Sequence, residues 1–295
     1  MYKILVIIIL FITSLNSNAQ TYTDIEQALK TPLKVRHFKM EGEDITKIPK
    51  QIQKFKNLET LDLKNCRITK IPKFLASLKN LTVLNLSNNK LSEIPIGVFN
   101  ISQLKTLILY ENNINSIPNE ILLLENLEDI HLSGSVKIEN LKVLTKLPNL
   151  DGLSLNDFGY KEIPNFVYQI KNLKYLYMWG NEIGEVSDSI HMLTELVFLD
   201  LVENKLLSFP TAVLDLKNLS ILLLSSNMIS DIPKEIMKLS SLTQLYIDNN
   251  PITSIPMELG KINTLEICDL TKTDISEDNY EEIREQMPNI FFQWE

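Results

Sequence analysis

Leucine and isoleucine recur along this chain at a fixed spacing of 23 residues, and this period constrains the fold more than any other feature. Units align without an insertion from starts at residues 35, 58, 81, 104, 127, 150, 173, 196, 219, 242 and 265. The unit from Leu219 shows the pattern most fully, as Leu-x-x-Leu-x-Leu-x-x-Asn-x-Ile-x-x-Ile-Pro. A fixed period of roughly 20–50 residues indicates stacked units with a shared core, because one unit cannot bury its own apolar side chains.

The positions within the unit predict its local structure. Leucines at positions 4 and 6 predict a short strand with one buried face, so that stacked units form a parallel sheet. A proline at position 15, as at Pro233, predicts a short helical or 3-10 segment after it. At position 9 a buried amide can bond backbone groups of neighbouring coils, and this position holds Asn89, Asn112, Asn181, Asn204, Asn227 and Asn250.

This unit, with its Ile-Pro step, resembles the repeats of secreted bacterial leucine-rich repeat proteins and of the Ras-group-related eukaryotic subclass. The resemblance covers residues 21–295. It implies an α/β solenoid, a horseshoe with a parallel β-sheet on the concave face and short helical or 3-10 segments on the convex face. It also implies a protein-binding concave face and no catalytic residues. We therefore expect a non-enzymatic binding scaffold without a cofactor.

The N-terminus has the composition of a secretory signal peptide over residues 1–19. Lys3 gives a positive start, residues 4–12 are continuously apolar, and small residues end at Ala19, where cleavage is expected. This apolar run is much shorter than the roughly 20 residues that cross a bilayer. We expect an exported protein without an integral membrane span in the mature chain. Its destination is the periplasm, the cell surface or the extracellular space.

Both ends of the repeat array need covers, because a terminal coil has no neighbour on one side. Residues 20–34 are expected to form an N-terminal helical cap, in which Thr23-Asp-Ile-Glu26 is a capping box that opens a helix through Leu29. The repeats occupy residues 35–276. Residues 277–295 are expected to form a C-terminal cap with one helix and a last strand over residues 290–294.

Two consecutive units depart from the pattern. Ser135 and Phe158 stand where the other units carry asparagine, although Asp157 could replace the amide. One interpretation is repeat drift, absorbed by a change in coil shape. The other is a functional bend or protruding loop at residues 133–141 and 156–161.

The residues that usually carry chemistry are scattered. Cys66 and Cys268 lie nine units apart, about 40 Å at the strand spacing, whereas a disulfide needs Cα atoms within roughly 7 Å. We expect both to be buried thiols. His37, His131 and His191 fall in different units without other ligands at metal-site spacing, so neither a zinc site nor a catalytic triad is predicted.

Charge and outward positions point to a protein partner. A net charge of −8 argues against nucleic acid or an anionic membrane as the main partner and favours a protein, in particular a basic segment of one. Positions 2, 3, 5, 7 and 8 are expected to point outward, and in the middle units they bring aromatic side chains among acids. The partner-binding residues that we predict are Tyr110, Glu111, Asp129, His131, Asp151, Tyr175, Tyr177, Trp179, Phe198, Asp200, Glu203 and Tyr246.

Other interpretations of this surface remain open. Aromatic side chains also stabilise strands by cross-strand packing, without any ligand. Instead of a protein-binding monomer, the chain could be a self-associating structural or adhesive surface protein. Aromatics beside carboxylates also suit glycans.

Overall fold

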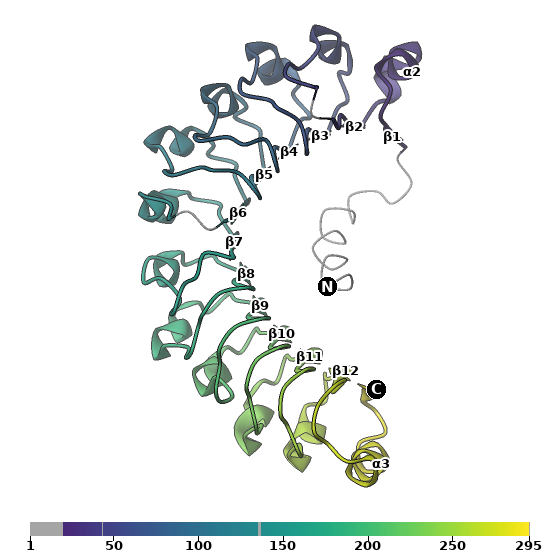
Figure 1. Ribbon diagram of the computed structural model, residues 1–295, viewed down its shortest axis with the longest axis vertical. Coiled ribbons are helices and arrows are strands. Elements are labelled where there is room, and N and C mark those ends of the chain that lie inside the picture. Colours follow the sequence, from purple (N-terminus) through teal and green to yellow (C-terminus); the bar gives the residue numbers. More distant parts are fainter. Residues whose placement is uncertain (1–19, 43, 135–136, 295) are drawn as a thin grey trace.

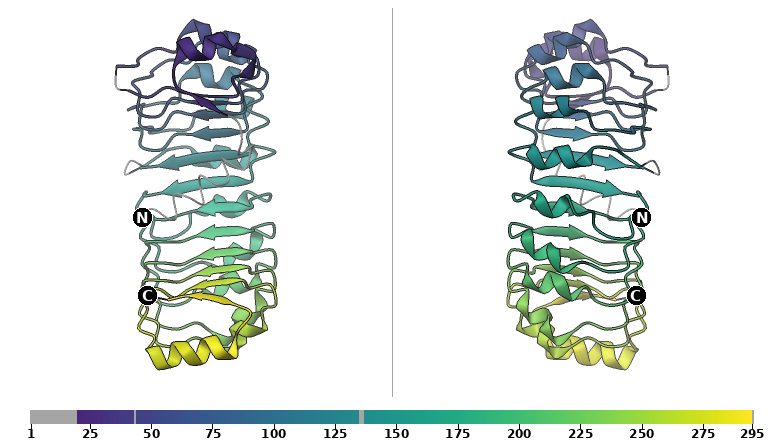
Figure 2. Two further views of the ribbon diagram at one scale, coloured as in Figure 1. Left: turned by 90° about the vertical axis from the view of Figure 1, so that its right-hand side faces the viewer. Right: turned by 90° about the vertical axis from the view of Figure 1, so that its left-hand side faces the viewer.

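The computed structural model describes residues 20–42, 44–134 and 137–294, so the predicted signal peptide at residues 1–19 lies outside the described residues. The described chain forms a horseshoe, with strands along the inner, concave side and helical turns along the outer, convex side (Figure 1). A 13-stranded sheet runs through the whole arc, and its strands follow the order of the chain. Figure 2 shows these strands stacked one above another, one to each coil. The predicted leucine-rich repeat horseshoe is confirmed.

The elements are short. The strands are β1 (Thr21–Tyr22), β2 (His37–Lys39), β3 (Thr60–Asp62), β4 (Val83–Asn85), β5 (Thr106–Ile108), β6 (Asp129–Ser133), β7 (Gly152–Asn156), β8 (Tyr175–Tyr177), β9 (Phe198–Asp200), β10 (Ile221–Leu223), β11 (Gln244–Tyr246), β12 (Ile267–Asp269) and β13 (Phe291–Gln293). The α-helices are α2 (Ile25–Lys30) and α3 (Glu277–Gln286). The 3-10 helices are η1 (Pro32–Lys34), η2 (Lys50–Lys54), η3 (Lys73–Ser77), η4 (Ile96–Asn100), η5 (Asn119–Leu123), η6 (Leu141–Lys146), η7 (Val167–Gln169), η8 (Asp188–Met192), η9 (Thr211–Asp215), η10 (Lys234–Lys238) and η11 (Met257–Lys261).

Neighbouring coils are in register over one full unit. Leu222 of β10 pairs with Leu199 on one side and Leu245 on the other, so equivalent positions stack along the arc. The side chains of Leu219 and Leu222 are fully buried in a continuous apolar core. The core therefore grows by one layer with each coil, as the leucine period predicts.

Prolines set the start of the convex segments. Pro233 is the N-cap of η10, with an extended backbone (φ −72°, ψ 148°). A proline is also the N-cap of the 3-10 segment in most other units. Proline fixes φ and donates no hydrogen bond, so it suits the point where the chain leaves one direction and turns into a helix. Ile236 and Leu239 then point inward and are fully buried. The predicted 3-10 segments are confirmed.

The position-9 asparagines join each coil to the one before it. Oδ1 of Asn227 accepts from the backbone N–H of Leu206 (3.0 Å), and Nδ2 donates to the carbonyls of Leu201 (2.9 Å) and Leu224 (2.9 Å). These backbone groups are buried, so the amide satisfies polar atoms that water cannot reach. Equivalent bonds form what we call the inner ladder, made by Asn89, Asn112, Asn181, Asn204, Asn227 and Asn250.

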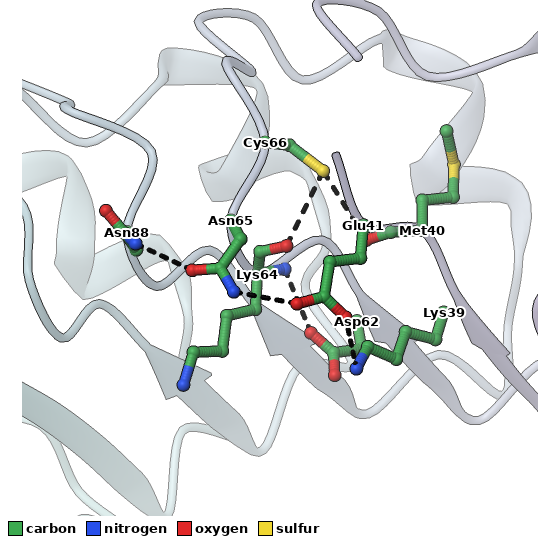
Figure 3. Close-up of polar contacts among 8 residues, drawn as sticks. All are labelled: Lys39, Met40, Glu41, Asp62, Lys64, Asn65, Cys66 and Asn88. Atoms are coloured by element: carbon green, nitrogen blue, oxygen red, sulfur yellow. Dashed lines mark hydrogen bonds and ion pairs between the residues drawn. The ribbon is translucent and has the colours of Figure 1, made fainter. Parts of the chain in front are cut away.

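Cys66 takes the place of asparagine in the second unit. Its Sγ lies 3.4 Å from the carbonyl oxygen of Met40 and 3.6 Å from that of Lys64, so a weak thiol donor replaces the amide (Figure 3). Burial raises the pKa of this thiol. Cys66 and Cys268 are both free and buried, as predicted.

A second set of asparagines, at position 23, joins the coils between each convex 3-10 segment and the strand that follows it. Asn218 donates from Nδ2 to the carbonyl of Thr194 in the preceding coil (2.8 Å). The same bond is made by Asn57, Asn80, Asn126, Asn149 and Asn172, and we call this set the outer ladder. The outer ladder was not predicted, although an Asn-Leu step recurs at the unit boundaries as its sequence signal.

The two irregular units are held together differently from the rest. Strands β6 and β7 are five residues long and pair over their whole length, from Asp129–Gly152 to Ser133–Asn156, whereas other pairs span three residues or fewer. The outer ladder also continues across them. The gap in the inner ladder is thus accompanied by longer strand pairing, which is a change of coil shape. The segment at 133–141 is described only in part, since residues 135 and 136 lie outside the described residues.

Asp157 does not replace the missing amide, and that prediction was wrong. Its side chain is exposed, and its backbone is left-handed (φ 61°). Its carboxylate lies over Gly180 of the next coil, and a carboxylate has no N–H to donate to the buried carbonyls. Phe158 instead packs partly buried against the core.

The N-terminal helix begins one residue later than predicted. Asp24, not Thr23, is the N-cap of α2, and its Oδ1 accepts from the N–H groups of Glu26 (2.7 Å) and Gln27 (3.1 Å). The Asp24 carboxylate thus supplies the cap on its own, without the reciprocal box. Before it, the two residues of β1 pair with β2 and start the sheet, and this strand was not predicted.

At the C-terminus, α3 covers the last coil and β13 adds the last strand. Tyr280, Ile283 and Met287 are buried against the core, as predicted for one helical face. The Tyr280 ring stacks on Trp294 (centroids 4.5 Å apart, 13° between planes), and its hydroxyl donates to the carbonyl of Phe292 (3.2 Å). This bond occupies a backbone acceptor of the last strand, which hinders pairing with another chain.

The inner ladder should contribute more to stability than the outer one. Replacing Asn227 with alanine removes the partner of the Leu206 N–H and of the Leu201 carbonyl, at about 1–3 kcal/mol for each unsatisfied group, whereas the Leu224 carbonyl keeps its bond from Asn250. We expect Asn227→Ala to lower the urea midpoint of unfolding strongly. Asn218→Ala is the matched control, because it removes one exposed bond and should cost about 1 kcal/mol or less. Equal losses for the two variants would contradict this difference.

Candidate functional site

The outward positions of neighbouring strands form rows along the concave face. In the middle coils these rows bring together an apolar group distinct from the main core. Its buried centre consists of Tyr177, Phe198, Val202 and Leu223, and partly buried around it lie Tyr175, Trp179, Ile221 and Tyr246. We call this group the concave aromatic cluster. It joins four of the predicted partner-binding aromatics: Tyr175, Tyr177, Trp179 and Phe198, with Tyr246 at its edge.

Several predicted contact residues are more buried than outward positions imply, so their expected exposure was wrong. Tyr177 is 4% exposed, Phe198 2%, His131 5%, and Asp200 is fully buried. The rings of Tyr177 and Phe198 lie 4.8 Å apart and cover each other. Cross-strand packing, the other interpretation left open above, therefore accounts for the centre of the cluster. Tyr175, Trp179 and Tyr246 keep part of their surface accessible.

Small residues in β7 explain why the neighbours close over it. Gly152 and Ser154 have little side-chain volume. All five residues of β7 are buried, although alternate residues of a strand face opposite sides of the sheet. The rings of His131 and Tyr177 come within 6.0 Å of each other across Ser154, from coils on either side. A Cβ added at Gly152 would overlap the carboxylate of Asp129, so this acid lies over the glycine.

Tyr110, His131 and Ser154 form a polar chain beside the cluster. The Tyr110 hydroxyl lies 3.0 Å from Nδ1 of His131 and donates to Oγ of Ser154 (3.2 Å). With its proton used in that bond, the hydroxyl accepts from an Nδ1–H of the histidine. Burial lowers the pKa of His131 to about 4, so the ring is neutral at pH 7. This arrangement links side chains of three successive coils.

Lysines form ion pairs with two of the acids at position 2, just before the strands. Lys174 pairs with Asp151 (3.0 Å) and Lys105 with Glu128 (2.7 Å). Desolvation, followed by the charges of Asp151 and Glu128, raises the pKa of Asp129 to about 6. An open polar hollow of about 500 Å³ lies beside this group and is lined in part by Glu128, Asp151 and Lys174.

Asp200 is the unusual acid of the site. Its Oδ1 accepts from the N–H of Val202 (3.0 Å), but Oδ2 is buried without a hydrogen-bond partner. Asn85 and Asp269 occupy the same repeat position, and there a hydroxyl at position 7 (Ser87 and Thr271) gives a further bond. Valine cannot give that bond. Desolvation raises the pKa of Asp200 to about 7.

The site combines aromatic side chains with acidic ones. Within the described ranges, no group of three or more histidine, cysteine or acidic side chains is placed to hold a metal ion. In the same part of the chain, no helix is long and apolar enough to cross a membrane. The concave aromatic cluster instead offers flat apolar surface with carboxylates around it, which suits contact with another macromolecule.

Comparisons with known proteins agree with this architecture. Family models match at residues 165–289, described as a leucine-rich repeat region, and at residues 56–97, described as leucine-rich repeats in two copies. The chain is a leucine-rich repeat solenoid. No curated protein sequence matches it.

Solved structures of leucine-rich repeat proteins resemble it in fold. A leucine-rich repeat protein of Leptospira interrogans is 23% identical with a TM-score of 0.52, over 93% of this chain and 99% of that one. An internalin of Listeria monocytogenes is 20% identical with a TM-score of 0.59, over 93% of this chain and 84% of that one. A plant peptide hormone receptor, solved in complex with its peptide, is 22% identical with a TM-score of 0.53, over 88% of this chain and 48% of that one.

Asp200 should make the stability of the solenoid depend on pH. Its pKa is about 7 when folded and 3.8 ordinarily, so between these values the folded chain binds more protons and stability falls as pH rises. Asp200→Asn removes this charge, and we expect a higher melting temperature than wild type at pH 8.5. The difference should shrink at pH 5. Asp269→Asn, at the same repeat position, is the control and should show no such gain. A loss of stability in Asp200→Asn at pH 8.5 would contradict the interpretation.

Proposed function

We propose that the chain is an exported, non-enzymatic scaffold that binds a protein partner through the concave aromatic cluster and the acids around it. The observation that carries this proposal is the second apolar cluster on the concave face, which lies outside the main core and keeps three aromatic rings partly accessible. Aromatic residues dominate the energy of protein interfaces, because they bury a large area at a small cost in conformational entropy.

The burial of Tyr177 and Phe198 changes how this surface is expected to work. They form a rigid floor, while Tyr175, Trp179 and Tyr246 give the accessible contact area. A preorganised floor favours binding, because little side-chain freedom is lost on association. The acids favour a partner with basic groups, as the negative net charge also does. The plant receptor complex supports peptide or protein recognition by this architecture in general.

Export is supported by the composition of residues 1–19, with the positive start, apolar run and small residues of a signal peptide. The principal contacts that we propose are the accessible rings of Tyr175, Trp179 and Tyr246. Asp151 and Glu203 are the proposed charged contacts. The buried residues His131, Tyr177, Phe198 and Asp200, together with the half-buried Tyr110, support them from below.

The test uses accessible rings only, so that folding is preserved. Mature protein is immobilised, captured proteins are identified, and the affinity of the purified partner is then measured. We expect the double variant Trp179→Ser, Tyr246→Ser to bind at least about tenfold more weakly, because truncated hot-spot residues cost about 2 kcal/mol or more. The melting temperature of each variant is measured alongside.

Met237→Ser is the matched control. This side chain is 46% exposed in η10 on the convex side, away from the concave cluster, and its loss should leave the affinity unchanged. Unchanged binding by the double variant would contradict the proposal. Light scattering distinguishes self-association, since the proposal expects a monomer at micromolar concentration.

A further inference from the structure

Charge is distributed very unevenly along the solenoid. Residues 20–100, which form the N-terminal cap and the first coils, contain 14 lysines and arginines against 8 acids. Residues 101–295 contain 14 lysines and arginines against 29 acids. The net charge of −8 therefore combines a basic N-terminal end with a strongly acidic remainder.

Much of the basic charge is concentrated on the outer side of the first two coils. Lysines stand there in three pairs at equal repeat positions: Lys47 and Lys70 at position 13, Lys50 and Lys73 at position 16, and Lys56 and Lys79 at position 22. The two coils are joined in register through β2 and β3, so the members of each pair are neighbours. All six side chains are exposed, on and beside η2 and η3 of the convex side (Figure 1). We call these six residues the convex lysine patch.

The repeat itself does not require lysine at these positions. At position 13 the later units carry serine or an acid, and the acids of the described repeats are Glu93, Glu139, Glu162, Glu185 and Asp231, all exposed. The same turn before the 3-10 segment thus accepts either sign of charge. The lysines of the first two coils are therefore a property of that surface and not of the packing of the repeat.

Acids of the chain do not neutralise the convex lysine patch. The ion pairs of the first two coils join Arg36 to Glu59 and Lys39 to Glu41. Within the described ranges, none of the six patch lysines forms an ion pair with an acid. Neighbouring like charges repel one another, and an anionic partner relieves that repulsion.

An exposed leucine lies beside the patch. Leu33 of η1 is 63% exposed, and its carbonyl accepts from Nδ2 of Asn57 (2.8 Å), the residue that follows Lys56. Its neighbour Lys34 is exposed as well. Apolar side chains next to lysines are typical of protein surfaces that lie at the boundary between lipid and water. The lysines alone would suit any polyanion, whereas the leucine favours a lipid surface.

We propose that the convex lysine patch docks the protein on an anionic lipid surface, with Leu33 entering the headgroup region. Anionic headgroups give the surface a negative potential, which attracts each lysine close to it. The acidic coils do not prevent this contact, because the Debye length at physiological salt is about 8 Å and most of those coils lie farther along the arc.

This inference goes beyond the proposed function and does not rest on it. The concave aromatic cluster lies on the other face of the solenoid, in later coils (Figure 1). Docking through the convex side of the first coils therefore leaves the concave face open to a protein partner.

The probe is a suspension of phosphatidylcholine vesicles that contain about 30% phosphatidylglycerol, and the readout is sedimentation of the mature protein with them. We expect binding at about 0.1 M salt and its loss at about 0.5 M, because salt screens the attraction. Vesicles of phosphatidylcholine alone should not sediment the protein. Failure to bind the anionic vesicles at low salt would overturn the proposal.

Charge variants test the patch itself. The triple variant Lys50→Gln, Lys56→Gln, Lys73→Gln should bind anionic vesicles at least about tenfold more weakly, because three attracted charges are lost. The matched control replaces three exposed lysines at the same repeat positions in the acidic coils, with the same change in net charge: Lys142→Gln, Lys217→Gln, Lys234→Gln. It should bind as the wild type does. Equal losses in the two triple variants would contradict docking through the patch.

A leucine variant distinguishes a lipid surface from another polyanion. Leu33→Ser should weaken vesicle binding at least about threefold, because a side chain that enters the headgroups is lost. Leu123→Ser is the control, since Leu123 is 59% exposed in η5, outside the patch, and should have no effect. Retention on heparin, an acidic polysaccharide, without binding to anionic vesicles would overturn the assignment to lipid.

The double variant Trp179→Ser, Tyr246→Ser separates this proposal from the proposed function. It should lose the protein partner and bind anionic vesicles as the wild type does. Loss of vesicle binding in this variant would place the lipid contact on the concave face and would overturn the proposal, whatever the result with the protein partner.

Discussion

The solenoid depends on hydrogen bonds that buried asparagine amides make between one coil and the next. Each coil leaves backbone groups facing its neighbour, and the inner ladder satisfies them where water cannot enter. The ladder stops at two coils, where β6 and β7 pair over five residues and the outer ladder continues. In this region, hydrogen bonds of the longer strand pair hold the coils together in place of the side-chain amides.

The same region shapes the concave surface. β7 carries Gly152 and Ser154, so larger side chains from both neighbouring coils close over it and make a packed floor. The concave aromatic cluster lies directly beyond, in the coils where the inner ladder resumes at Asn181. The altered coils and the preorganised aromatic surface are therefore adjacent. The rings of Tyr177 and Phe198, which were expected to be exposed, are buried and support that surface.

Periodic features were predictable from the sequence, and individual contacts were not. A leucine every 23 residues is a repeated signal, so the sheet, the 3-10 segments and the inner ladder follow from it. The outer ladder was missed because its Asn-Leu signal coincides with the unit boundary. The burial of His131, Tyr177 and Asp200 depends on the sizes of side chains in neighbouring coils. The alternation of apolar and polar residues within one strand gives no information about those sizes. Asp157 shows the same limit, since its carboxylate lies in space that Gly180 of the next coil leaves open.

Photo-crosslinking tests most directly whether the concave surface is where the partner binds. The photoreactive amino acid p-benzoylphenylalanine is placed at Tyr246, on the edge of the concave aromatic cluster, and separately at Met237, which is exposed in η10 on the convex side. The two positions lie in neighbouring coils, so they differ mainly in the face they occupy. We predict a covalent adduct with the purified partner from position 246 and little from position 237. Crosslinking from position 237 alone would contradict a concave binding surface.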